Sequence, residues 1–266
     1  GTTNENYGVL MATTYLQLTN ELLREMNEVE TTSSDFTSTV GIQTHVKDLI
    51  NRSYLDMVNE EPQWPFLAIG ESGSTDPMYG NTYIETVAGT RWYELKPASS
   101  SITTDYGYVD WDNFLLTTVG VTDEAAPFTI RNLRFTSIEE WKDYFRLSQN
   151  QDDADEQNYG TPSRVIKSPD NRKFGLSAIP DKVYRIYFYA YTLPTSLSAA
   201  TDVIVFPDVY VPVLINRARY YMHQFKDNAQ AAAFALQDYQ RGLRNMKLHL
   251  MTPAPTYLKD DRMRFV

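Results

Sequence analysis

Carboxylates are the first candidates for chemistry in this chain, and their densest group lies in residues 151–156. Asp152, Asp153, Asp155 and Glu156 bring several oxygen atoms close together in sequence, as binding of Ca²⁺ or Mg²⁺ requires. The segment lacks the alternating Asp/Asn spacing and the glycine of a calcium-binding loop. We therefore expect a solvent-exposed acidic loop rather than a metal site.

Two pairs of adjacent acids raise the alternative of acid–base chemistry. Glu60 with Glu61, and Glu139 with Glu140, are of the residue type that hydrolyses glycosidic bonds. Neighbouring acids in a helix or before a turn are usually solvated. A polysaccharide or cell-wall hydrolase is therefore kept only as an alternative.

Cysteine and histidine offer little chemistry. The absence of cysteine excludes disulfides, thiolate metal sites and cysteine nucleophiles. The three histidines, His45, His223 and His249, lie far apart in sequence, which disfavours a metal site or a Ser-His-Asp relay. Sequence motifs for phosphate loops, dinucleotide binding and HExxH zinc sites are also absent. We predict a chain that is not an enzyme, with no cofactor and no catalytic or metal-binding residue.

The charge balance bears on nucleic acids and membranes. Against 24 Lys and Arg stand 34 Asp and Glu, so the formal net charge is −10 and the chain repels DNA on average. No run of 18 apolar residues predicts a membrane span. The N-terminus begins at Gly1 and lacks the basic-then-apolar layout of a secretory signal. We expect residues 1–11 to be a disordered or leader segment.

The C-terminal residues 252–266 have a different character. Pro253 and Pro255 disfavour regular structure and keep the segment extended. Such a segment with apolar anchors is suited to docking on another subunit, and a frayed terminus is the alternative. The anchors are Tyr257, Leu258, Met263, Phe265 and Val266.

Apolar periodicity predicts helices at both ends of the chain. Spacings of three and four predict helices over 13–29 and 44–59, and over 209–225 and 227–248. The last of these carries Ala232, Phe234, Ala235, Leu236, Tyr239, Leu243, Met246 and Leu250 as its apolar residues.

The middle of the chain predicts strands. Alternation with a period of two, interrupted by Gly and Pro, runs from Phe66 to Phe135. Ser137–Glu140 matches a capping box and predicts a helix of about two turns. Strands then return, and the run Val183–Tyr191 carries the strongest β signal in the chain.

These elements predict an α+β fold. We expect N- and C-terminal helical hairpins to form one bundle, with an inserted antiparallel β-sheet or sandwich and an extended C-terminal tail. The segments are a leader (1–11), a helical hairpin (12–62), a β-rich insert (63–136), a short helix with strands (137–205), a helical pair (206–251) and a docking tail (252–266).

The order of elements and several phrases resemble the head-to-tail adaptor, or connector, proteins of tailed bacteriophages, especially short-tailed ones. One of the matching segments, Phe206–Tyr210, also has a physical explanation. Asp208, directly after Pro207, is expected to cap the following helix. The phrases are Tyr15–Leu23, Val46–Asn51, Ser137–Trp141, Pro180–Tyr191 and Phe206–Tyr210.

The resemblance implies a structural ring, commonly of twelve copies, between the portal and the tail nozzle or tail tube. Double-stranded DNA would pass through this ring without specific binding, and the acidic balance suits such a passage. The ring would lie at the head–tail junction of the virion, after assembly in the bacterial cytoplasm. Residues 253–266 would then reach the portal, and the loop at 151–156 is a candidate for the channel lining. A nozzle subunit is the second alternative.

Overall fold

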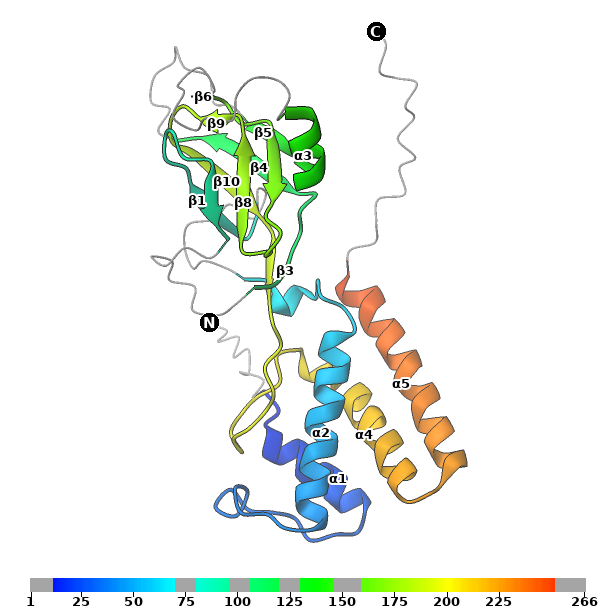
Figure 1. The fold of residues 1–266 in the computed structure, drawn as a ribbon. Coiled ribbons are helices and arrows are strands. Elements are labelled where there is room, and N and C mark those ends of the chain that lie inside the picture. The colour runs from blue at the N-terminus through cyan, green and yellow to red at the C-terminus, as the bar shows by residue number, and fades with distance from the viewer. Residues whose placement is uncertain (1–11, 70–79, 96–105, 120–129, 146–158, 252–266) are drawn as a thin grey trace, which may run out of the picture. The chain divides into compact units, whose positions relative to one another are not determined.

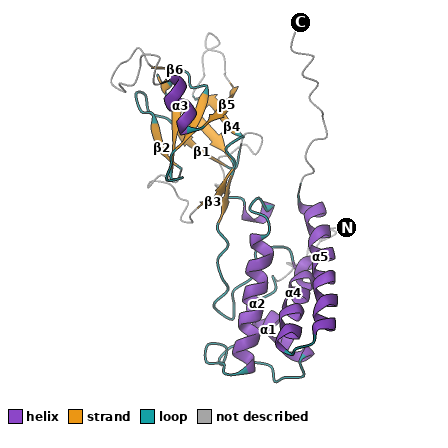
Figure 2. Cartoon of the chain, turned by 45° about the vertical axis from the view of Figure 1, so that its right-hand side comes forward, coloured by secondary structure: helices purple, strands orange, loops and turns teal. Residues whose placement is uncertain are grey.

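The computed structural model describes residues 12–69, 80–95, 106–119, 130–145 and 159–251 (Figure 1). The chain divides into a helical unit, built from Gly1–Phe66 and Pro194–Val266, and a β unit, Leu67–Leu193. Helices and strands are both extensive, which confirms the mixed α+β class. Figure 2 shows strands gathered in the β unit and long helices in the other unit.

Four helices make up the described core of the helical unit. The helix α5 packs along α4, α4 packs on α2 and α1, and α1 packs on α2. Their bounds are α1 Tyr15–Glu25, α2 Ile42–Asn59, α4 Val211–Phe225 and α5 Ala229–Leu250, with short 3₁₀ turns at Pro65–Leu67 and Asp208–Tyr210.

Local backbone signals set the ends of α1 and α2. The side chain of Thr14 accepts a hydrogen bond from the backbone N–H of Gln17, and the Gln17 side chain accepts one from the Thr14 backbone, which completes a capping box. The predicted extension of this helix to residue 29 is wrong, because Asn27 adopts the left-handed conformation with φ 58°. Gly41, at φ 60°, directly precedes α2.

The predicted apolar stripes of the helices are buried with few exceptions. Leu18, Leu22 and Leu23 in α1 are fully buried, as a 3.6-residue period facing a core requires. The prediction fails at Phe234 in α5, whose side chain is 60% exposed. The stripe of α5 that packs on α4 instead consists of Ala232, Ala235, Tyr239, Leu243 and Met246.

The entry to α4 differs from expectation. Asp208 does not cap that helix: it begins a 3₁₀ turn, and its carboxylate accepts the backbone N–H of Thr13 at 3.0 Å. An antiparallel bridge between Thr14 and Val203 lies beside this contact. The carboxylate therefore fastens the start of α1 to the segment that leads into α4.

The β unit contains a seven-stranded sheet of order β1-β10-β4-β5-β7-β8-β2, and two-stranded sheets β11-β3 and β6-β9. The strands before and after α3 thus pair with one another in the same sheet. The bounds are β1 Thr82–Glu85, β2 Trp92–Glu94, β3 Tyr106–Val109, β4 Phe114–Thr118, β5 Ile130–Thr136, α3 Ile138–Phe145, β6 Tyr159–Gly160, β7 Arg164–Lys167, β8 Lys173–Ser177, β9 Ile179–Pro180, β10 Tyr184–Phe188 and β11 Ala190–Thr192.

The sheet is mostly antiparallel, as predicted, but β5 and β7 pair in parallel, and so do β6 and β9. The strands β5 and β7 are joined by a connection that contains α3, and parallel neighbours require such a crossover. The hydroxyl of Ser137 accepts the backbone N–H of Glu140 at 3.1 Å, so the predicted helix start is confirmed. The strong run Val183–Tyr191 is divided between β10 and the start of β11, which lie in different sheets.

Candidate functional site

The two groups of residues singled out by sequence lie outside the described residues. One is the acidic loop with Asp152, Asp153, Asp155 and Glu156, and the other is the tail with Tyr257, Leu258, Met263, Phe265 and Val266. Their roles remain predictions.

The adjacent acids take part in surface ion pairs. Glu60 lies 3.3 Å from the ammonium of Lys247, and Glu140 lies 3.8 Å from Arg164. His45 packs its ring on Phe225, with ring centroids 4.3 Å apart. Within the described ranges, no three His, Asp or Glu side chains gather as a metal site would require.

A membrane-crossing helix is not found in the described part of the chain, whose helices lack the necessary apolar length.

The helical unit contains a polar cluster that was not predicted from the sequence. The Arg217 Nε donates to Asp56 Oδ2 at 3.0 Å, and its Nη2 donates to the Tyr221 hydroxyl at 2.9 Å. The Tyr221 hydroxyl donates to the same carboxylate. Burial alone would lower the pKa of Arg217, but its hydrogen bond to Asp56 leads to a net rise. This group therefore stays cationic and joins α2 to α4.

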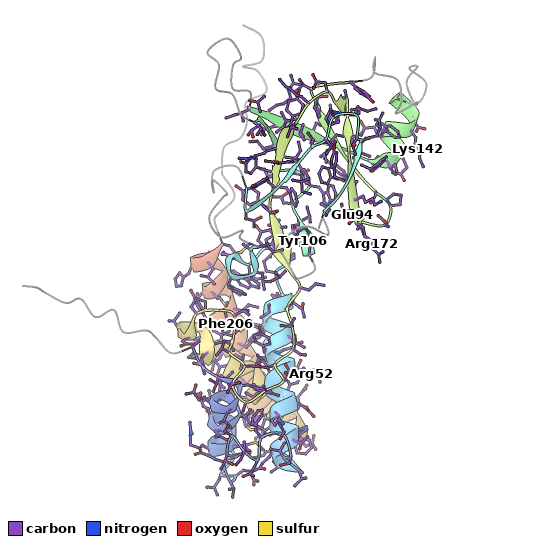
Figure 3. The ribbon with its side chains drawn as sticks, turned by 90° about the vertical axis from the view of Figure 1, so that its left-hand side faces the viewer. Arg52, Glu94, Tyr106, Lys142, Arg172 and Phe206 are labelled. Atoms are coloured by element: carbon purple, nitrogen blue, oxygen red, sulfur yellow. The ribbon has the colours of Figure 1, made fainter. Side chains whose placement is uncertain are left out.

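Aromatic rings surround this cluster. The Arg217 guanidinium lies 4.7 Å from the ring centroid of Tyr221 and 5.1 Å from that of Tyr239. Arg52, labelled in Figure 3, approaches the Tyr221 ring within 4.2 Å. The spacing of Arg217 and Tyr221, one helical turn apart, was the only sequence signal for the cluster. These contacts occupy the polar groups, so the cluster is a structural junction.

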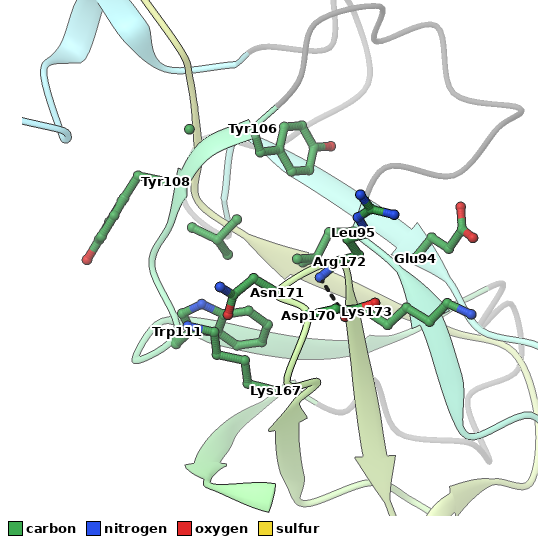
Figure 4. A pocket seen from close by; sticks show the side chains of 12 residues that line it. Glu94, Leu95, Tyr106, Tyr108, Trp111, Lys167, Asp170, Asn171, Arg172 and Lys173 are labelled. Atoms are coloured by element: carbon green, nitrogen blue, oxygen red, sulfur yellow. Dashed lines mark hydrogen bonds between the residues drawn. The ribbon is translucent and has the colours of Figure 1, made fainter. Parts of the chain in front are cut away.

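The β unit holds a cavity of about 880 Å³ (Figure 4). Its lining mixes aromatic side chains with both signs of charge. Its walls include Tyr106, Tyr108, Trp111, Lys167, Asp170 and Arg172.

Several of the polar groups around this cavity are committed to local contacts. The Asp170 carboxylate accepts the Ser168 hydroxyl and the backbone N–H of Arg172, and these bonds hold its pKa below the usual range. Trp111 stacks on Phe114 at 5.2 Å, and the Lys167 ammonium lies 5.4 Å from its ring centroid. Asp170 thus serves to shape a turn.

The last surface feature to consider is the set of exposed large apolar side chains. Most of those that the structure describes belong to the helical unit. The β unit shows four: Val87, Ile130, Val183 and Leu193. The helical unit shows Val29, Val40, Val203, Val205, Val209, Phe225, Phe234 and Leu248. Among the described residues, exposed large apolar side chains are therefore more numerous on the helical unit than on the β unit.

A family model for the SU10 adaptor protein matches residues 13–259, and the chain belongs to this family. Membership indicates a bacteriophage adaptor, a structural component of the virion. No curated protein matches the chain.

Proposed function

We propose that this adaptor forms a ring at the head–tail junction of a short-tailed phage, between the portal and the tail nozzle. DNA passes through the ring, and the chain performs no chemistry of its own. The main support for this proposal is the family match, which extends over nearly the whole chain. The number of copies proposed is twelve.

The charge and the exposed apolar residues support this proposal. A net charge of −10 disfavours retention of DNA phosphates, because each phosphate contact would slow the passing duplex. The apolar side chains exposed on the helical unit provide area for contacts between copies and with neighbouring proteins.

The tail is proposed to fasten the ring to the portal. Residues 252–266 combine two prolines with five apolar anchors, and an extended segment of this kind binds by placing side chains in pockets of its partner.

The test is a deletion of residues 253–266, followed by measurement of binding to the portal of the same phage. We expect a folded chain, judged by circular dichroism, that no longer binds. Deletion of residues 1–11 is the matched control, because it removes a terminal segment of similar length and should leave binding intact. A truncated chain with full portal affinity, or a virion map that places the protein away from the junction, would overturn the proposal.

A further inference from the structure

Among the described elements, none is seen to pack on the outward side of α5. Since α5 packs on α4 through one stripe, the opposite side carries Phe234, Arg241 and Leu248 at intervals of seven residues, which places them along one side of the helix. Phe234 is 60% exposed and Leu248 72% exposed. Arg241 and the nearby Arg244 are exposed and have no ion-pair partner within the described ranges. We call these four residues the α5 face.

A second surface has the opposite charge. The connection between α1 and α2, residues 26–41, carries Glu28, Glu30 and Asp35 and no basic residue. Glu30 pairs with Arg24 of α1 at 3.3 Å, and Lys47 of α2 donates to the carbonyl of Phe36, so Glu28 and Asp35 supply the acidic charge that has no ion-pair partner within the described ranges. It also displays the two most exposed large apolar side chains of the described structure, Val29 at 79% and Val40 at 78%. We call this segment the acidic connection.

The acidic connection has a defined conformation. The Asn20 amide side chain bonds both the N–H and the carbonyl of Thr31, each at 2.9 Å. Gln43 donates to the carbonyl of Val29 at 3.0 Å. Phe36 is fully buried and contacts the ring of Tyr15 edge-on at 5.0 Å. Val29 is therefore held at the surface by bonded neighbours, although exposure of an apolar side chain costs free energy.

The two surfaces lie on different sides of the helical unit. Figures 1 and 2 both place α5 along one edge of the helical unit, whereas the acidic connection runs beneath the lower ends of α1 and α2. Surfaces that are different and complementary produce heterologous contacts, which repeat from copy to copy and close into a ring if the rotation permits. Contact between two α5 faces would instead bring arginines of like charge together.

We propose that the acidic connection of one copy docks on the α5 face of the next copy. Val29 and Val40 cover Phe234 and Leu248, while Glu28 approaches Arg241 and Arg244. This proposal depends on the ring put forward under the proposed function, and it names the two surfaces through which neighbouring copies make contact.

Cross-linking tests the contact directly, because the chain has no cysteine of its own. A Val29→Cys chain is mixed with a Phe234→Cys or a Leu248→Cys chain and treated with a bismaleimide, both alone and in the presence of portal. We expect at least tenfold more cross-linked dimer than from Val29→Cys mixed with Val209→Cys, a control with a similarly exposed valine at 73%. Yields no higher than the control in both settings would overturn the proposal.

Charge reversal distinguishes contact between copies from binding of the α5 face to the portal. Arg241→Glu with Arg244→Glu should reduce cross-linking at least tenfold, and Glu28→Arg in the other chain should restore part of it. Glu30 is left unchanged in this test because it pairs with Arg24 of α1. If cross-linking survives the α5 reversal while portal binding falls, the α5 face meets the portal and the proposal is wrong. If the copies cross-link as expected but the chain never binds portal, this interface stands and the adaptor function fails.

Discussion

One aromatic cluster of the β unit and one of the helical unit differ in what their rings surround. In the β unit, Phe114 stacks on Phe188 at 5.0 Å and contacts Phe174 at 5.6 Å, and all three rings are fully buried. In the helical unit, a comparable group of rings surrounds the charged Arg217, whose side chain keeps 20% exposure. Apolar rings tolerate small displacements, whereas the Arg217 hydrogen bonds require α2 and α4 to meet in one register.

This difference assigns separate tasks to the units. The β unit derives its cohesion from apolar burial, which has no directional requirement. The helical unit adds to its buried apolar stripes a set of polar bonds between α2 and α4, and it leaves charged and apolar groups exposed at its surface. Such a unit is suited to repeated contacts between copies, since its surfaces are held in place before assembly.

We call Phe114, Phe174 and Phe188 the phenyl core of the β unit. Truncation of one of these rings should produce the largest loss of stability. Phe114→Ala removes a ring that is 1% exposed and should cost about 3–5 kcal/mol of unfolding free energy. Hydrogen exchange should accelerate in the strands of the β unit and remain slow in α2 and α4. Leu214→Ala, at a fully buried position of α4, is the control that should affect the helices instead. Equal acceleration in both units from Phe114→Ala would show that they unfold together.

Alkaline pH should weaken the helical unit through its buried tyrosines. Burial raises the pKa of Tyr239 to about 12, an effect that the nearby Arg217 only partly opposes. The unfolded side chain has a pKa near 10, so the unfolded state loses its proton first as the pH rises. The stabilisation is complete below pH ~10 and is lost between about 10 and 12, at about 1.4 kcal/mol per pH unit.

Tyr239→Phe is the variant that measures this contribution. It keeps the ring and removes the titrating hydroxyl, so urea denaturation between pH 10 and 12 should show a shallower loss of stability than in the unchanged chain. Other buried tyrosines, Tyr54 and Tyr93 among them, also have raised pKa values through burial, so some loss remains. An unchanged slope would mean that Tyr239 ionises as freely in the fold as in the unfolded chain.

The sequence was a good guide where local periodicity decides the structure. The stripes of α1, α2 and α4 and the start of α3 followed from spacing and capping. The parallel pairing of β5 with β7 depends on partners about 30 residues apart, and no local pattern encodes it. Phe234 shows a related limit, since apolar character alone does not distinguish a residue that faces the core from one that is exposed at the surface.

The candidate surfaces were harder to predict than the helices. Arg217 and Asp56 are 161 residues apart, so only the packing of α4 on α2 brings them together. The acidic connection carries no periodic pattern that predicts its structure, yet the Asn20 side chain, 11 residues away from Thr31, gives it a defined conformation.

Removal of Asp56 should have an intermediate effect. Asp56→Ala leaves Arg217 and the Tyr221 hydroxyl without their shared acceptor, which should cost about 1–3 kcal/mol. Arg217→Met, which keeps the packing length of the side chain, should cost less when added to Asp56→Ala than when made alone. Costs that add to within about 0.5 kcal/mol would show that the cluster does not act as a unit.

The smallest effect concerns the close approach of α4 and α5. A Cβ on Gly242 would lie 2.8 Å from Cγ2 of Val213, so Gly242→Ala should incur about 1–3 kcal/mol of overpacking. The same change gains about 1 kcal/mol of helix propensity, and we expect a net loss of about 1 kcal/mol in urea denaturation.

The side chain of Val213 determines whether Gly242→Ala stabilises or destabilises the chain. In a Val213→Ala background the clash is relieved, and Gly242→Ala should then stabilise the chain by up to about 1 kcal/mol. Stabilisation in both backgrounds would mean that the helices can separate at no cost. The helical unit would then be less rigid than its polar junction implies, and the contrast with the phenyl core of the β unit would be lost.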